Sequence, residues 1–146
     1  MKIYTNKAPR KPRTKAERLA VKIAEDVILQ LKLGVYEPSH CYFSREATDC
    51  RVCAMGAAWA SMIKLTTGVS PDFGINSDAM AAQLRPAMNG YAREMEAAYE
   101  GWEAQYSDTT YDAAWIRRFR SDKGRMRAIM RNVVRNGGHF RLDEVK

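Results

Sequence analysis

The sequence predicts an all-α protein, a compact bundle of five to six helices with a basic N-terminal arm, and three observations support this prediction. The chain has 146 residues, which is enough for one ordinary domain and too few for two. Hydrophobic residues make up 46% of it, so it can build a core. Its apolar residues recur mostly at helical spacing, and at most a minor hairpin is expected near residues 35–43.

Residues 1–13 are predicted to form the arm, outside the core. Pro9 and Pro12 stand among lysines and arginines in this segment. Proline blocks a helix, and like charges that repel one another favour an extended chain. Residues 14–146 are then expected to form a single α-helical domain.

The first helix has clear signals at both ends. Thr14 and Glu17 have the spacing of a capping box, in which each side chain accepts a hydrogen bond from the backbone of the other residue. Gly34 supplies the stop, because glycine adopts the left-handed conformation at low cost. The apolar positions between them recur at helical spacing and are expected to face the core: Ala20, Ile23, Ala24, Val27, Ile28 and Leu31.

A second helix is expected to begin after Thr48 or Asp49 as N-cap and to end near Thr66. It contains so many small residues that another backbone is expected to pack closely against it. We therefore expect this helix to be central and buried, with Trp59 in the core. The other two tryptophans are also expected to be buried: Trp102 and Trp115.

The remaining helices have weaker boundaries. A third is expected after Ser77 as N-cap, ending or kinking near Pro86, and a fourth follows a short turn. A short helix that opens at Asp112 and a last helix that ends at Asn136 complete the set. The glutamates of the fourth helix are expected on its solvent-facing side: Glu94, Glu96, Glu100 and Glu103. The core side of the last helix is expected to carry Met126, Ile129, Met130 and Val133.

The net charge of +7 is divided unevenly along the chain. Residues 1–18 carry +6, with seven basic side chains against one acidic, and residues 117–135 carry +7, with eight against one. Residues 19–116 carry −6. Two basic ends of this kind favour a phosphate-bearing partner. The alternative is that they pair with the acidic middle of the same protein.

The candidate residues for binding a partner or a nucleic acid belong to the two basic ends. In the last helix three arginines recur at i, i+4 and i+8, which places them along one flank, and Arg120 extends this row. A row of guanidinium groups on a rigid helix beside a flexible basic arm is typical of a phosphate-binding surface. The candidates are Lys7, Arg10, Lys11, Arg13, Arg120, Arg127, Arg131 and Arg135.

The cysteines form the one pattern that suits metal or thiol chemistry. Cys50 and Cys53 are separated by two residues, Cys41 lies nine positions upstream, and His40 or His139 could complete a zinc site. Cysteine among alanines in a helix is more often a buried apolar side chain, and we favour that interpretation. No catalytic residue, cofactor or metal is predicted, because no phosphate-binding loop, nucleophile signature or metalloprotease motif is present.

The composition excludes several classes of protein. No stretch approaches the roughly 20 consecutive apolar residues of a membrane span, so no membrane segment is expected. An odd number of cysteines, and N-terminal charges that no apolar run follows, indicate a reducing cytoplasm rather than secretion.

A short motif, Cys53-Ala54-Met55-Gly56-Ala57, opens the alanine-rich helix. With residues 24–28 of the preceding helix, residues 125–132 of the last one and the Asn136-Gly137-Gly138 stop, it resembles small bacteriophage and bacterial proteins that have a C-x-x-G-A helix motif and no established activity. The resemblance implies a phage origin and a location in the cytoplasm of the bacterial host. It assigns no catalytic residue.

We therefore expect a non-enzymatic, phage-type binding protein that acts through its basic surfaces on a host nucleoprotein or defence component, for example as an inhibitor of a defence system. Three alternatives stay open. The chain could be a nucleic-acid-binding accessory protein, a small zinc- or thiol-dependent enzyme, or a structural protein that self-assembles by docking its basic ends on the acidic middle of a neighbour. The expected partners are a host protein or nucleoprotein complex, DNA or RNA, and no membrane.

Overall fold

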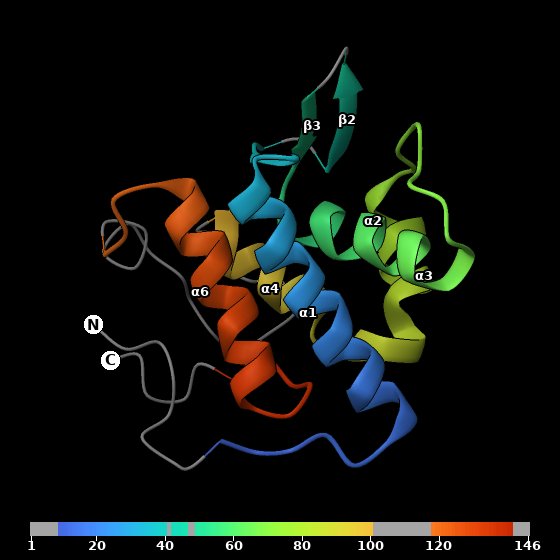
Figure 1. Ribbon diagram of the computed structural model, residues 1–146, viewed down its shortest axis with the longest axis vertical. Coiled ribbons are helices and arrows are strands. Elements are labelled where there is room, and N and C mark those ends of the chain that lie inside the picture. Colours follow the sequence, from blue (N-terminus) through green and yellow to red (C-terminus); the bar gives the residue numbers. More distant parts are fainter. Residues whose placement is uncertain (1–8, 41, 47–48, 101–117, 142–146) are drawn as a thin grey trace.

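A computed structural model describes residues 9–40, 42–46, 49–100 and 118–141. These residues are mostly helical, with five helices and a small three-stranded sheet (Figure 1). The predicted helical class is confirmed in this coarse sense, and the sheet corrects the all-α prediction. The elements in chain order are α1 (Lys15–Leu33), β1 (Tyr36–Pro38), β2 (Phe43–Glu46), β3 (Asp49–Val52), α2 (Ala54–Thr67), α3 (Ser77–Met88), α4 (Ala92–Glu100) and α6 (Asp122–Arg135).

The first helix, α1, has the predicted ends. Thr14 Oγ1 accepts the Glu17 N–H at 3.1 Å, and Glu17 Oε1 accepts the Thr14 N–H at 2.9 Å, so the capping box is complete. At the other end Gly34 has a φ of 74°. The helix packs against α2, α3 and α6, and its fully buried side chains are Ala20, Ile23, Ala24, Val27 and Leu31.

The sheet has the strand order β1-β3-β2, with β1 parallel and β2 antiparallel to β3. Tyr36 pairs with Cys50, and Phe43 pairs with Val52. The hairpin predicted near residues 35–43 is therefore in the wrong place, because the antiparallel partner of β2 is β3. The predicted start of the second helix, after Thr48 or Asp49, is also wrong. Residues 49–52 form β3, whose backbone pairs with β1 on one side and β2 on the other.

Helix α2 begins at Ala54 and is central, as predicted. Its N-cap is Cys53, whose sulfur accepts the Gly56 N–H at 3.4 Å. Small side chains let other backbones come close, and a Cβ on Gly56 would lie 1.2 Å from the Tyr42 carbonyl oxygen. Trp59 is 4% exposed, so its predicted burial is confirmed. The other two tryptophans lie outside the described residues.

The later helices close the core around α2. Asn76, not Ser77, caps α3, because its Oδ1 accepts the Ala79 N–H at 2.8 Å. Ser121 caps α6, which packs against α1 and α4. The predicted core side of α6 is buried: Met126, Ile129, Met130 and Val133. The helix predicted to open at Asp112 begins outside the described residues.

Within the described ranges, no helix combines the length and the apolar character that a bilayer crossing requires.

Candidate nucleic-acid interface

A basic cleft lies where the described part of the arm meets the chain that follows α6. Figure 1 shows these two segments running together at the end of α6, far apart in sequence but close in space. Asn136 and Glu17 also face the cleft. Its basic side chains come from both segments: Arg10, Lys11, Arg13, His139 and Arg141.

Backbone contacts hold the arm side of the cleft. The Arg10 N–H donates to the Arg135 carbonyl oxygen at 2.9 Å, where the arm forms a parallel bridge to Asn136. Gly137 has a φ of 67°, and a Cβ there would lie 3.1 Å from the carbonyl oxygens of Arg10 and Lys11. The arm backbone is thus seated against the end of α6, while its lysine and arginine side chains are exposed.

The other side of the cleft is held by hydrogen bonds to α6 and to Tyr91, which lies just before α4. Asn132 Oδ1 accepts the Arg141 N–H at 2.8 Å, and Asn132 Nδ2 donates to the Arg141 carbonyl oxygen at 2.5 Å. The Tyr91 hydroxyl donates to the Gly138 carbonyl oxygen at 2.7 Å. Gly138 has a φ of 99°, and a Cβ there would lie 2.6 Å from the Glu17 carbonyl oxygen. These contacts fix the backbone that carries Arg141.

Glu17, the one carboxylate among the described residues that line the cleft, is already hydrogen-bonded. Glu17 Oε2 lies 2.7 Å from His139 Nε2. This hydrogen bond, together with those from the backbone N–H groups of Thr14 and Arg13, lowers the pKa of Glu17 to about 2. Glu17 is therefore ionised at neutral pH. Among the described residues, four lysine and arginine side chains face this carboxylate, which gives the described lining a formal charge of +3 when histidine is not counted.

The structure brings together only part of the predicted binding set. Three of the candidates line the cleft: Arg10, Lys11 and Arg13. Lys7 lies outside the described residues. Arg141 was not predicted from the sequence, and His139 was considered there for zinc or thiol chemistry and not for this cleft. The Gly137-Gly138 pair could have indicated that His139 and Arg141 lie near the end of α6, because two glycines with positive φ turn the chain back past the helix end.

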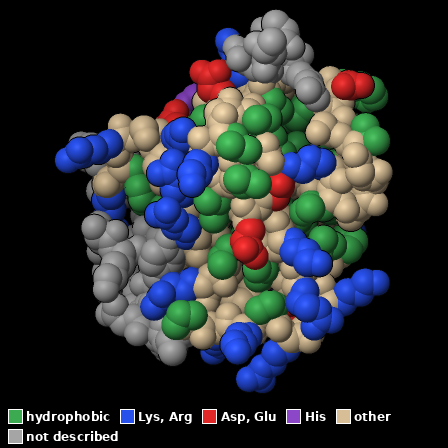
Figure 2. Space-filling model, viewed as in Figure 1, with side chains coloured by type: hydrophobic (Ala, Val, Ile, Leu, Met, Phe, Trp, Pro, Cys, Tyr) green, Lys and Arg blue, Asp and Glu red, His purple; other side chains and the backbone are tan. Residues whose placement is uncertain are grey.

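The predicted arginine row follows α6 away from the cleft. Arg131 is exposed and Arg127 is half-buried, whereas Arg120 precedes the helix at its opposite end. Arg131 and Arg135 line a separate groove beside α1. Within the described part of the chain, no carboxylate forms an ion pair with Arg127 or Arg131, so pairing with the acidic middle is not seen there. Figure 2 shows lysine and arginine side chains gathered over α6.

The cysteines do not form a metal site among the described residues. Cys50 is buried on β3, Cys53 is 1% exposed, and Cys41 is not described. Burial and the neighbouring Glu96 raise the pKa of Cys53, whereas a metal ligand or nucleophile has to be a thiolate. In the described ranges no three histidine, cysteine or acidic side chains are grouped so as to hold a metal ion. The prediction of buried thiols is confirmed for Cys50 and Cys53.

Glu96 of α4 is buried and the side chain of Glu100 is largely covered, which corrects the prediction that these glutamates face solvent. Glu96 is 2% exposed, and its Oε2 accepts the Met55 N–H at the start of α2 at 2.8 Å. The Glu100 side chain is 8% exposed and lies 2.6 Å from His40 Nδ1. The prediction failed because α4 is covered by both α2 and α6, so it has no single buried stripe. Glu103 lies outside the described residues.

The burial of Glu96 predicts a pH-dependent stability. Burial, which outweighs the hydrogen bond from Met55, raises the pKa of Glu96 from 4.5 to about 7. The folded state therefore binds a proton that the unfolded state releases, and this stabilisation is lost as the pH rises from about 4.5 to about 7. Glu96→Gln is expected to remove this pH dependence and to be more stable than the wild type by about 3 kcal/mol at pH 8.

Urea unfolding of both proteins at several pH values between about 5 and 8 measures this difference. Glu37→Gln, which changes an exposed glutamate, is the control and is expected to follow the wild type. Parallel stability curves for the wild type and Glu96→Gln would contradict the assignment.

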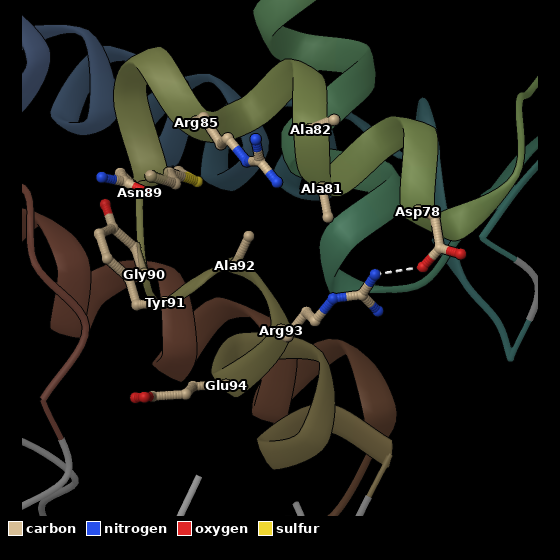
Figure 3. Close-up of a pocket in the computed structure, with 11 residues that line it drawn as sticks. Asp78, Ala81, Ala82, Arg85, Asn89, Gly90, Tyr91, Ala92, Arg93 and Glu94 are labelled. Carbon is tan, nitrogen blue, oxygen red and sulfur yellow. Dashed lines mark hydrogen bonds and ion pairs between the residues drawn. The ribbon is translucent and has the colours of Figure 1, made fainter. Parts of the chain in front are cut away.

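A second hollow lies between α3 and α4 (Figure 3). Arg85 extends into it from α3, Glu94 stands on its far side, and Arg93 is bonded to Asp78. Its charged side chains are of both signs, so it lacks the predominantly positive character of the basic cleft. We therefore take the cleft as the candidate functional site.

Comparisons with protein-family models, with curated proteins and with solved structures found no match for this chain.

Proposed function

We propose that this protein is a non-enzymatic binding protein that holds the phosphate backbone of a nucleic acid in the basic cleft. One observation carries the proposal. Within the described part of the chain, four lysine and arginine side chains from segments far apart in the sequence converge on one cleft, and the one carboxylate among its described lining residues is hydrogen-bonded to a histidine. Contacts of this kind supply affinity for phosphates and do not read the base sequence.

The construction of the cleft supports this proposal. Three of its four cations are arginines, whose planar guanidinium groups donate two hydrogen bonds to one phosphate. The backbones that carry Arg10 and Arg141 are hydrogen-bonded to α6. Binding therefore has to order side chains only, which lowers its entropic cost.

In this proposal the nucleic acid belongs to a host nucleoprotein or defence component, and binding in the cleft blocks or recruits it. The phage-like sequence motif, not the geometry, supports this biological setting. Capture of partners from a bacterial lysate with and without nuclease treatment tests it. Partners that are lost on nuclease treatment support contact through nucleic acid, whereas partners that are all retained would contradict it.

The affinity for nucleic acid is expected to depend steeply on salt. If all four cations of the cleft contact phosphates, the logarithm of the affinity for duplex DNA falls with the logarithm of salt concentration at a slope of about −3 to −4. Fluorescence anisotropy with a labelled duplex of about 20 base pairs, between about 50 and 300 mM salt, measures this slope.

A second duplex of the same length and unrelated sequence is the control, and its affinity is expected to match. A slope close to zero, or a strong preference for one sequence, would contradict binding through phosphate contacts.

A further inference from the structure

A shallow groove runs between α1 and α6 and adjoins the basic cleft at Pro9. Its floor is apolar, with Ile28 and Leu29 contributed by α1 and Val134 by α6. Leu29 is 48% exposed although it lies beside a packed helix pair. The groove thus exposes apolar surface that the described residues leave uncovered.

The apolar surface continues along α1 beyond the groove. Leu33 follows Leu29 by one helical turn, so both lie on the same side of α1, and Leu33 is 63% exposed. Val35, just after the helix, is 46% exposed. Single exposed apolar residues are ordinary, but several in succession are typical of an interaction surface. Figure 2 shows hydrophobic side chains between groups of lysine and arginine on this face.

The rim of the groove is mainly basic. Lys32 stands on α1, and Arg131 and Arg135 stand one turn apart on α6. Glu25 is the one acidic side chain among the described residues that line the groove. Three cations against one carboxylate, around an apolar floor, complement a surface that is both apolar and negatively charged.

We propose that this groove docks an acidic amphipathic helix of a partner protein. The apolar residues of such a helix recur at i, i+3 and i+4 and would cover Leu29 and Ile28. Its carboxylates would lie against Lys32 and Arg131 on opposite rims. The longer wall of the groove is about two turns of α1, residues 25–32, so the partner segment is about 8 to 11 residues long.

Charge and polarity favour this occupant over the others. The arm of this chain is itself basic and would be repelled by the rim. A phosphate backbone would satisfy the rim but has no apolar side chains to cover Leu29. A second copy of the chain that docked through the same groove would bring a rim of the same positive charge. An acidic helix with apolar residues on one side can form ion pairs with the basic rim and cover the apolar floor.

The test uses the whole protein and a fluorescein-labelled synthetic peptide of about 12 residues, with leucines at helical spacing and glutamates elsewhere. Leu29→Ser is expected to weaken peptide binding about tenfold or more, because it removes apolar surface from the groove floor. Leu65→Ser is the matched control, since Leu65 is 43% exposed on α2, and it is expected to bind like the wild type. A peptide of the same composition, with its leucines scattered around the helix, is expected to bind about tenfold more weakly.

Three results would overturn the proposal. The first is equal peptide binding by Leu29→Ser and Leu65→Ser, with both proteins shown to be folded by their melting curves. The second is a loss of duplex DNA binding by Leu29→Ser that is as large as its loss of peptide binding, which would assign the groove to nucleic acid. The third is a wild-type dimer, seen by light scattering, that Leu29→Ser converts to a monomer.

The proposals for the groove and for the cleft can be refuted independently. Neutralising Arg10, Lys11 and Arg13 is expected to weaken DNA binding and to leave peptide binding within about twofold, because these side chains do not line the groove. A protein that binds the peptide but no DNA would leave the groove proposal standing and remove the proposed function.

Discussion

Replacing Gly56 with alanine, which adds a single methyl group, is expected to lower the free energy of unfolding by about 4 kcal/mol or more. The new Cβ would lie 1.2 Å from the Tyr42 carbonyl oxygen and 2.4 Å from its carbonyl carbon. Both atoms are backbone, so no side-chain rotation relieves the overlap. The chain would have to move α2 away from the segment before β2. Urea unfolding monitored by circular dichroism measures the change.

Gly124→Ala is the matched control for this prediction. Gly56 and Gly124 are each the third residue of a helix, and each donates its N–H to the side chain of the N-cap residue. A Cβ on Gly124 would meet only the Ser121 Oγ, at 3.3 Å. Alanine there is expected to change stability by less than about 1 kcal/mol. Equal effects of the two substitutions would contradict the packing of α2 described above.

Neutralising the arm side of the cleft is expected to weaken duplex DNA binding on the order of 100-fold at low salt and to flatten the salt slope by about 2 to 3. The variant R10A/K11A/R13A removes three of the four lysine and arginine side chains that face the cleft. Their side chains are exposed, so the melting temperature is expected to stay within a few degrees of that of the wild type. Fluorescence anisotropy over a salt series measures both affinity and slope.

The control for this variant removes the same formal charge elsewhere. K22A/R51A/R85A changes three exposed cations on α1, β3 and α3, none of which lines the cleft. It is expected to lower the affinity less than tenfold through the reduced net charge alone. Should the two triple variants lose affinity equally, binding would depend on total charge and not on the cleft.

The ends of α1 could be predicted from the sequence because their determinants are local. Thr14 and Glu17 form the capping box with each other, and Gly34 adopts its positive φ without help from distant residues. The apolar side of α6 was predictable in the same way, since one buried stripe faces α1.

The region from β1 to α2 could not be predicted because its determinants are not local. Cys50 and Val52 follow a pattern that a helix could also accommodate, and their strand conformation depends on pairing with Tyr36 and Phe43. Such pairing joins segments that only the folded chain brings together. Tertiary packing likewise decided the burial of Glu96, because α4 is enclosed between two helices.

For the cleft, the strongly basic character of residues 1–18 and 117–135 could be predicted from the sequence, and so could the choice of Arg10, Lys11 and Arg13 as candidates. Their position opposite Arg141 and the Glu17–His139 pair is seen only in the folded chain. The reason is physical: charge is a property of each residue, whereas a cleft requires two segments more than 100 residues apart to be hydrogen-bonded around one helix end. The backbone hydrogen bond from Arg10 to Arg135 in particular carries no signal of its partner in the sequence, because nearly every residue has the same backbone groups.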